Sequence, residues 1–427
     1  MFGGLLKSTS LAALIAVAGF AAAGGANAAD LGGNCCTDLE ERIAELEATT
    51  ARKGNRKVSL TISGQVHTGV LFFDDGVESN AYVTDNDNSS SRFRFVGSAK
   101  IDSNWSAGYL LEIEVDDAAT NRVTAALDEV NNGLVIRQSN WYLDNKQLGR
   151  ITVGQASTAT DDIILADTAG ASPAAFADQL VGNSINFRSA AGALTTLSVN
   201  TVSAGSFDTA RGNVVRYDTP TMAGFRATAA WGEDDFWDVA LWYAGKLGDF
   251  KIVGGIGYFE NNDAFALGVA GANTVLLDSE RVTELKGSIS IMHEPTGLFG
   301  SFAYVDRDIE LTTSLNAARR AILANGMEYY YFNGGISVPK LLPVGKTVFY
   351  GEYGEGNGVS RIDQFGGVDV VDADLTVYGL GVVQHVPAAE MEIYASYKNI
   401  ELDARTAAAN VNTQAIDIVF TGARIKF

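Results

Sequence analysis

The stretch Val58-Ser59-Leu60-Thr61-Ile62-Ser63-Gly64-Gln65-Val66-His67 alternates apolar and polar side chains. Apolar residues take positions 58, 60, 62 and 66, and the polar residues lie between them. A period of two predicts a β-strand whose two faces differ chemically. In a soluble sandwich the apolar face would point inward. In a membrane barrel that face would contact lipid, and the polar face would line a lumen.

The same alternation recurs along the rest of the chain, and we count sixteen segments. They lie at 58–73, 91–101, 104–117, 133–144, 148–156, 213–218, 224–232, 236–247, 249–260, 281–293, 298–310, 326–339, 345–356, 373–386, 389–401 and 414–427. We interpret the links as short and long polar ones in strict alternation, as in an up-and-down barrel with short periplasmic turns. An even number of strands lets the first pair with the last and removes the sheet edges. A β-rich sandwich or propeller is the alternative, although no propeller-length repeat is present.

Composition narrows the class of protein. The 427 residues include 46 Gly and only 6 Pro, which suits strands and tight turns. No long apolar run follows residue 28, which argues against a polytopic helical membrane protein. A net charge of −20 argues against binding nucleic acid, whose phosphates attract basic surfaces. With two Cys and three His, we expect no structural metal and no cofactor.

The N-terminus carries export signals. Residues 1–28 are typical of a secretory signal peptide, with Lys7, an apolar core at 11–20 and the small-residue cleavage site Ala26-Asn27-Ala28. Its removal would leave a mature chain with a net charge of −21, because Lys7 is the only charged residue lost. We therefore expect a protein that acts beyond the cytoplasm.

Residues 29–57 predict a short periplasmic α-helix. Its apolar residues have heptad spacing, at Leu39, Ile43 and Leu46. The segment is either a small coiled coil beneath an oligomer or a helix packed on its own chain. Cys35 and Cys36 are candidates for interchain disulfides or unpaired thiols, and the sequence leaves this open.

Three stretches resemble general bacterial porins. They are residues 148–155 (LGRITVGQ), residues 213–220 (NVVRYDTP) leading to Ala223-Gly224-Phe225, and the C-terminal strand. The acidic N-terminus is similar to that of alphaproteobacterial members. The resemblance implies a 16-stranded antiparallel transmembrane β-barrel with an inward-folded third loop, and a homotrimer. Phe427, which ends an alternating strand, resembles the signal that the barrel-assembly machinery recognises.

One link, at about 157–212, is far longer than the others and follows the fifth segment. The resemblance implies that this third long loop folds into the barrel and forms a constriction. It carries four acids as candidate pore residues, namely Asp161, Asp162, Asp167 and Asp178.

Basic residues on the wall would face these acids. Arg92 and Arg94 share one face of the second segment, and Phe93 and Phe95 share the other, so the arginines point toward the lumen. Arg137 and Arg216 also have inward parity. Charges at a constriction bias which ions pass. The alternative is that the arginines only pin the loop through ion pairs. The acidic balance of the chain favours a mild preference for cations.

We therefore predict a porin in the Gram-negative outer membrane, a water-filled channel for passive diffusion of ions and small hydrophilic solutes. Its partners would be outer-membrane lipids, lipopolysaccharide and the assembly machinery. The start Ala29-Asp30 is similar to barrel N-termini coupled to peptidoglycan, so a structural tether or adhesin is the alternative function. No histidine lies in a recognisable catalytic motif, and we expect no enzyme activity.

Overall fold

The computed structural model describes residues 58–128, 133–209, 211–233, 235–262, 279–311, 317, 321, 323, 326–360 and 363–427. The predicted signal peptide (1–28), the predicted periplasmic helix (29–57) and Ala29 lie outside the described residues. Within that part of the chain, no helix is long and apolar enough to cross a membrane.

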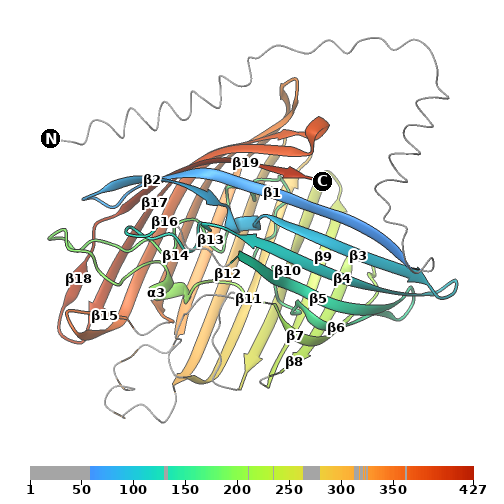
Figure 1. Cartoon of the computed structure of the whole chain (residues 1–427), viewed down its shortest axis with the longest axis horizontal. Helices are drawn as coiled ribbons and strands as arrows, with labels where there is room; N and C mark the ends of the chain where they lie inside the picture. The colour runs from blue at the N-terminus through green and yellow to red at the C-terminus, as the bar shows by residue number, and fades with distance from the viewer. Residues whose placement is uncertain are drawn as a thin grey trace.

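The described residues form one sheet of nineteen strands, of which sixteen make a closed antiparallel wall (Figure 1). The wall strands are β1 (Ser59–Asp74), β3 (Arg92–Lys100), β4 (Trp105–Asp116), β5 (Gly133–Asn145), β6 (Gly149–Ser157), β7 (Arg211–Asp218), β8 (Phe225–Gly232), β9 (Phe236–Leu247), β10 (Phe250–Asn261), β11 (Ser279–His293), β12 (Leu298–Leu311), β13 (Gly326–Leu342), β14 (Gly345–Val359), β16 (Val368–Val386), β17 (Met391–Thr406) and β19 (Ile416–Lys426). Each pairs with the next, and β1 closes the circle by pairing with both β19 and β3. The predicted sixteen-stranded barrel is therefore confirmed.

Short elements lie in the links. They are β2 (Ser79–Asp85), β15 (Gln364–Phe365), β18 (Asn410–Asn412), α3 (Asn200–Ser203) and the 3₁₀ turns η1 (Asp87–Ser89) and η2 (Pro387–Ala389). The strict alternation of short and long links is wrong at one place. Strands β8 and β9 are joined by residues 233–235 alone, at the end of the barrel where the other links are long.

The alternation along the wall is the reverse of that in a soluble sheet. In β9, Asp238 and Ala240 are buried, whereas Val239 and Leu241 are 42% and 45% exposed. In β11, Glu284 and Lys286 are both fully buried. Apolar side chains therefore cover the outer face of the barrel, and polar and small side chains cover the inner face, as expected for a wall in contact with lipid.

The link between β6 and β7, called here the 158–209 segment, contacts the inner face of β9 through β17. We call this half of the wall the anchoring side. One polar contact from each of seven strands illustrates this attachment. Two wall side chains accept hydrogen bonds from the segment, Asp238 from the Thr160 amide (2.7 Å) and Ser288 from the Ala166 amide (3.2 Å). Five wall side chains donate to oxygens of the segment: Arg307 to Ser203 (2.8 Å), Tyr329 to Ala177 (2.8 Å), Lys346 to Ala169 (2.6 Å), His385 to Gly170 (2.9 Å) and Lys398 to the side-chain amide of Gln179 (3.0 Å).

Apolar packing completes this attachment. The ring of Phe207 stacks on Tyr329, with centroids 3.8 Å apart and planes 11° apart. On β10 a glycine permits close approach, because a Cβ at Gly257 would lie 2.6 Å from the methyl carbon of Thr160. The segment therefore shares one hydrophobic core with the inner wall.

Candidate pore-lining site

Charged side chains gather on the inner face of β3, β4 and β5, part of what we call the cavity side, β3 through β7. The guanidinium groups of Arg92, Arg94 and Arg137 lie 3.4, 3.0 and 2.9 Å from the carboxylate of Glu112. Arg137 also pairs with Glu114 at 2.7 Å. Because Arg92 stands opposite Glu114 and Arg94 opposite Glu112 in the β3–β4 register, the alternating pattern itself brings these opposite charges together.

Arg137 reaches this cluster through a β-bulge. Gln138 stands opposite Glu112 and Ile136 opposite Ile113, which leaves Arg137 as an additional residue on β5. Strict alternation would place Arg137 on the same face as Trp141, which is 53% exposed on the outer surface. The bulge turns the guanidinium inward instead, a use of bulges that is common beside functional sites.

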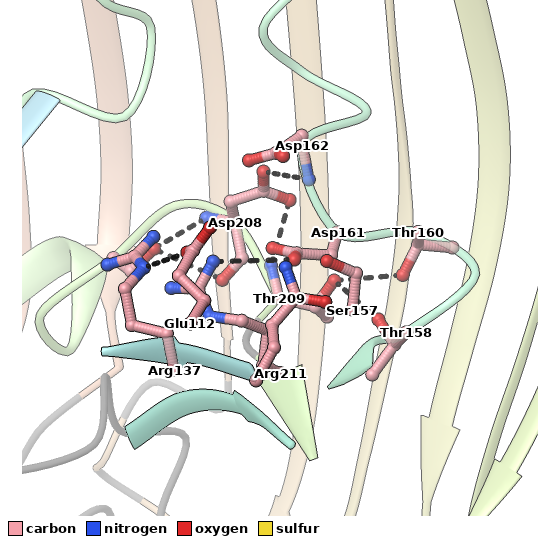
Figure 2. A network of polar contacts seen from close by, with 12 residues as sticks. Glu112, Arg137, Ser157, Thr158, Thr160, Asp161, Asp162, Asp208, Thr209 and Arg211 are labelled. Atoms are coloured by element: carbon pink, nitrogen blue, oxygen red, sulfur yellow. Dashed lines mark hydrogen bonds and ion pairs between the residues drawn. The ribbon is translucent and has the colours of Figure 1, made fainter. Parts of the chain in front are cut away.

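The 158–209 segment brings three carboxylates together across from these arginines (Figure 2). Asp161, Asp162 and Asp208 each offer an oxygen within 4.8 Å of the others. Asp161 pairs with Arg211 of β7 at 3.7 Å, and Asp208 pairs with Lys286 of β11 at 2.7 Å. Within the described part of the chain, the Asp162 carboxylate has no ion pair.

The two groups of charges border one cavity of about 100 Å³. Its charged lining residues are Asp87, Arg92, Glu114, Arg137, Asp161, Asp162, Asp178, Asp208 and Arg211. A second cavity of about 830 Å³ lies toward the short turns, against β3 through β8, and Arg150, Arg216, Asp218 and Arg226 contribute to it. Both of these cavities thus lie against the cavity side.

The remaining predicted site residues lie elsewhere. Asp167 accepts hydrogen bonds from the amides of Ala169, Gly170 and Ser172 at 2.8, 2.9 and 2.8 Å, so it shapes a turn and does not line the first cavity. Arg216 pairs with Asp218 at 2.8 Å and donates to the carbonyl of Thr158, which fixes the start of the segment.

Two further predicted residues make contacts that join separate parts of the chain. Asp178 lines the cavity but is buried, and it accepts hydrogen bonds from the Ser206 hydroxyl and the Phe207 amide. Phe427 exchanges backbone hydrogen bonds with Gly64, which joins the end of the chain to β1. Its part in assembly stays a prediction.

Sequence reasoning missed Arg211, Asp208 and Lys286 as members of the site. Asp208 lies at the end of the long link and Arg211 is the first residue of β7, where no alternating pattern extends. Lys286 lies on a recognisable strand, but only the tertiary contact with Asp208 reveals its role.

Crowding of the three carboxylates changes their acidity. The charge of Asp161, loss of surrounding water and the charge of Asp208 together raise the pKa of Asp162 to about 7. Burial raises the pKa of Asp208 to about 6, although Lys286 opposes this shift. Burial also raises the pKa of Asp178 well above its usual range. The cavity therefore contains acids that change charge near neutral pH.

Comparisons with known proteins agree with this architecture. Residues 10–405 match the model of a family described as Gram-negative porin. No curated protein matches the sequence. Among solved structures, a loop L8 deletion mutant of OmpT, an outer membrane protein of Vibrio cholerae, is 16% identical with a TM-score of 0.54, over 87% of this chain and 100% of that one.

Two other solved structures are similar. In-vitro folded OmpT of Vibrio cholerae in its trimer form is 16% identical with a TM-score of 0.51, over 87% of this chain and 99% of that one. The anion-selective porin from Comamonas acidovorans is 14% identical with a TM-score of 0.51, over 87% and 100%. The closed sixteen-stranded wall and the family match lead to one conclusion: the chain belongs to the Gram-negative porin family of outer-membrane channel proteins.

Proposed function

We propose that the chain forms a water-filled pore for passive diffusion of ions and small hydrophilic solutes, and that the 158–209 segment lies inside the barrel and narrows it. One observation carries the proposal. The segment is hydrogen-bonded to the inner face of the anchoring side. Its charged edge and the cavity side border the first cavity between them. Closing sixteen strands leaves room for water, which supports conduction.

In this proposal the acids of the segment and the arginines of the wall create an electric field across the constriction. Asp161 and Asp162 supply the negative edge, and Arg92 and Arg137 supply the positive edge. Arg94 supports this wall by its ion pair with Glu112. Asp167, Asp178 and Arg216 position the segment. Such opposed charges bias which ions pass a narrow point.

The first test is the single-channel conductance of the purified, folded protein in a planar bilayer. We expect discrete conductance steps that grow with salt concentration. A correctly folded barrel that gives no steps would contradict the pore. It would favour the alternative function, a structural tether or adhesin. Detection of a muropeptide on Ala29 would then test the tether.

The position of the segment has its own test. In a Cys35→Ser/Cys36→Ser background, a charged thiol reagent should reduce the conductance of an Asp162→Cys variant. The matched control is Leu241→Cys, whose side chain is 45% exposed on the outer face. Equal insensitivity of both variants, with labelling confirmed by mass, would show that the segment does not narrow the pore.

We also propose a homotrimer in contact with outer-membrane lipids and lipopolysaccharide, inserted by the barrel-assembly machinery. The trimer form of a similar solved structure and the heptad spacing within residues 29–57 support this assembly. Chemical crosslinking in detergent should give a species of three times the chain mass. A channel needs no catalytic group, so we propose no enzyme activity.

A further inference from the structure

We propose that the second cavity, which lies toward the short turns, is a binding subsite for small organic anions that carry an apolar group, such as aromatic carboxylates. The inference rests on the proposed function, because solutes that diffuse through the pore are the molecules that reach this cavity. Two observations carry it. Basic side chains outnumber acidic ones around the cavity, and an apolar pair lies on an inner wall that is mostly polar.

The cavity has a size suited to a small organic molecule. Its volume is about 830 Å³, and it lies against β3 through β8, which are neighbours in the wall (Figure 1). Lys146, in the turn after β5, and Pro220, in the turn after β7, both border it. Small-molecule sites typically have volumes of roughly 300–1,000 Å³. In the proposed pore, this cavity is the vestibule on the periplasmic side of the segment.

The cavity has a local excess of positive charge. Four basic and two acidic residues line it, namely Lys146, Arg150, Arg216, Arg226, Asp144 and Asp218. The excess is opposite in sign to the charge of the whole chain, which is −20. Because the walls have a low dielectric constant, this excess raises the concentration of small anions inside the cavity.

The two acids engage one arginine fully and two others only in part. Asp218 accepts from Arg216 with both oxygens, at 2.8 and 3.1 Å, whereas the Nε atom of Arg226 lies 3.9 Å from Asp218. Arg150 donates to Asp144 through Nε, at 3.0 Å, and within the described part of the chain its terminal nitrogens make no hydrogen bond. The side chains of Arg150 and Arg226 are 46% and 41% exposed. Each guanidinium therefore has N–H donors left for an anion in the cavity.

An apolar pair lies on the same inner wall. Val96 of β3 stands opposite Leu110 of β4, and both have the inward parity of Arg94 and Glu112. Both side chains line the cavity and are only partly buried. A ligand with an apolar body would remove this apolar area from water, which an inorganic ion would not do.

An aromatic ring lies between the apolar pair and the arginines. Asn140 stands opposite Leu110, and Tyr142 is the next inward residue on β5. A Cβ at Gly108 would collide with the Tyr142 ring, so the glycine lets the ring lie against the wall. The guanidinium carbon of Arg150 lies 4.2 Å from the centre of this ring, a contact that orients the guanidinium. The wall thus offers apolar, aromatic and cationic surface to one ligand.

The experiment compares three probes that separate charge from apolar area. Benzoate carries both, benzamide only the ring and acetate only the charge. Each is titrated at neutral pH against the purified, folded protein in detergent, and binding is followed by broadening of the probe signals in NMR. We expect benzoate to bind at least about fivefold more tightly than either benzamide or acetate.

Four variants locate the binding. Arg150→Gln and Arg226→Gln should each weaken benzoate binding by about fivefold, because an exposed ion pair is lost. Val96→Thr should weaken benzoate binding by about threefold and leave acetate binding unchanged, because it replaces a methyl group by a hydroxyl. The charge-matched control is Arg281→Gln on the outer face of β11, where the side chain is 45% exposed, and it should bind benzoate as wild type does. Heat-modifiable electrophoretic mobility confirms that each variant is folded.

The outcomes separate this inference from the proposed function, since binding in detergent requires no conduction. Benzoate bound in this pattern by a protein that gives no conductance steps would support the subsite and contradict the pore. Wild type that binds benzoate no more tightly than benzamide would overturn the subsite. Unchanged affinity in both arginine variants would do the same, as would an equal loss in Arg281→Gln.

A fourth probe identifies the anionic group. Guanidinium donors bind carboxylates and phosphates by the same geometry. Competition of phenyl phosphate with benzoate would support a subsite for both classes of anion. Benzoate binding that phenyl phosphate does not reduce would support a subsite for carboxylates alone.

Discussion

The anchoring side and the cavity side of the barrel have the same alternating wall but use their inner side chains differently. On the anchoring side, Arg307 and Tyr329 donate to backbone carbonyls of the 158–209 segment. On the cavity side, Arg92 and Arg94 pair with a carboxylate of the neighbouring strand. The difference shows that a polar inner face either binds a second layer of protein or faces water. The outcome depends on whether its side-chain donors bind carbonyls of that layer or carboxylates of a neighbouring strand.

The largest effect should come from Arg307 on the anchoring side. Its side chain is fully buried, pairs with Glu284 at 2.7 Å, and donates to Ser203 and Ser206. Arg307→Met should lower the free energy of unfolding by about 3–5 kcal/mol, because a buried carboxylate loses a partner. Urea unfolding of the protein in lipid vesicles measures this change.

Two variants control this prediction. Arg94→Met on the cavity side should cost about 1 kcal/mol or less, since the Arg94 side chain is 39% exposed and Glu112 keeps two other partners. Adding Glu284→Gln to Arg307→Met should recover part of the loss. Equal destabilisation by Arg307→Met and Arg94→Met would remove the distinction between the two sides.

The next effect concerns conduction through the cavity side. Arg137→Ala removes the bulged guanidinium that balances Glu112 and Glu114, so the pore should become more selective for cations and conduct larger currents. Ser288→Ala on the anchoring side removes a hydrogen bond to the Ile163 carbonyl (2.6 Å) and should cost about 1 kcal/mol without changing selectivity. Reversal potentials of both variants would test this, and an unchanged value in Arg137→Ala would contradict it.

Much of the fold was predictable from alternation alone. Each of the sixteen predicted segments overlaps a wall strand, because lipid on one side and polar groups on the other impose a period of two. Link length follows no such rule, and the three-residue link at 233–235 broke the expected alternation.

The site was less predictable than the wall. Parity correctly grouped Arg92 with Arg94 on one face, since both now contact Glu112. The sequence interpretation gave Arg137 an inward parity, but strict alternation groups it with the exposed Trp141. Its contact with Glu112 depends instead on a bulge, whose additional residue period-two counting does not detect. Composition identified Asp161 and Asp162 as acids of a long link. Their separation from Asp167, which shapes a turn, depends on the folded path of that link.

Acidification should weaken the cation preference by a moderate amount. The pKa values of Asp162 (about 7) and Asp208 (about 6) are raised, so both carboxylates lose their charge as the pH falls from 8 to 5. The same protonation also affects stability. The folded state binds these protons more readily than the unfolded state, so the contribution of these groups to the free energy of unfolding rises as the pH falls. The groups that face them are Asp161, Arg211, Arg137, Lys286 and Asp178.

Reversal potentials across this pH range measure the titration. Wild type should lose cation preference as the pH falls through 7, and Asp162→Asn should show a smaller change that is confined to lower pH. A reversal potential in wild type that does not vary between pH 8 and pH 5 would show that neither carboxylate acts on permeating ions.

The smallest effect should come from the outer face of the anchoring side, whose side chains point away from the 158–209 segment. Tyr304 donates to Glu328 at 2.6 Å on the exposed surface of β12 and β13. Because water and lipid headgroups can replace an exposed hydrogen bond, Tyr304→Phe should change the free energy of unfolding by about 0.5 kcal/mol or less. Conductance and selectivity should stay at wild-type values. A Tyr304→Phe variant as unstable as Arg307→Met would mean that the strands of the anchoring side, rather than their inner contacts with the segment, determine stability.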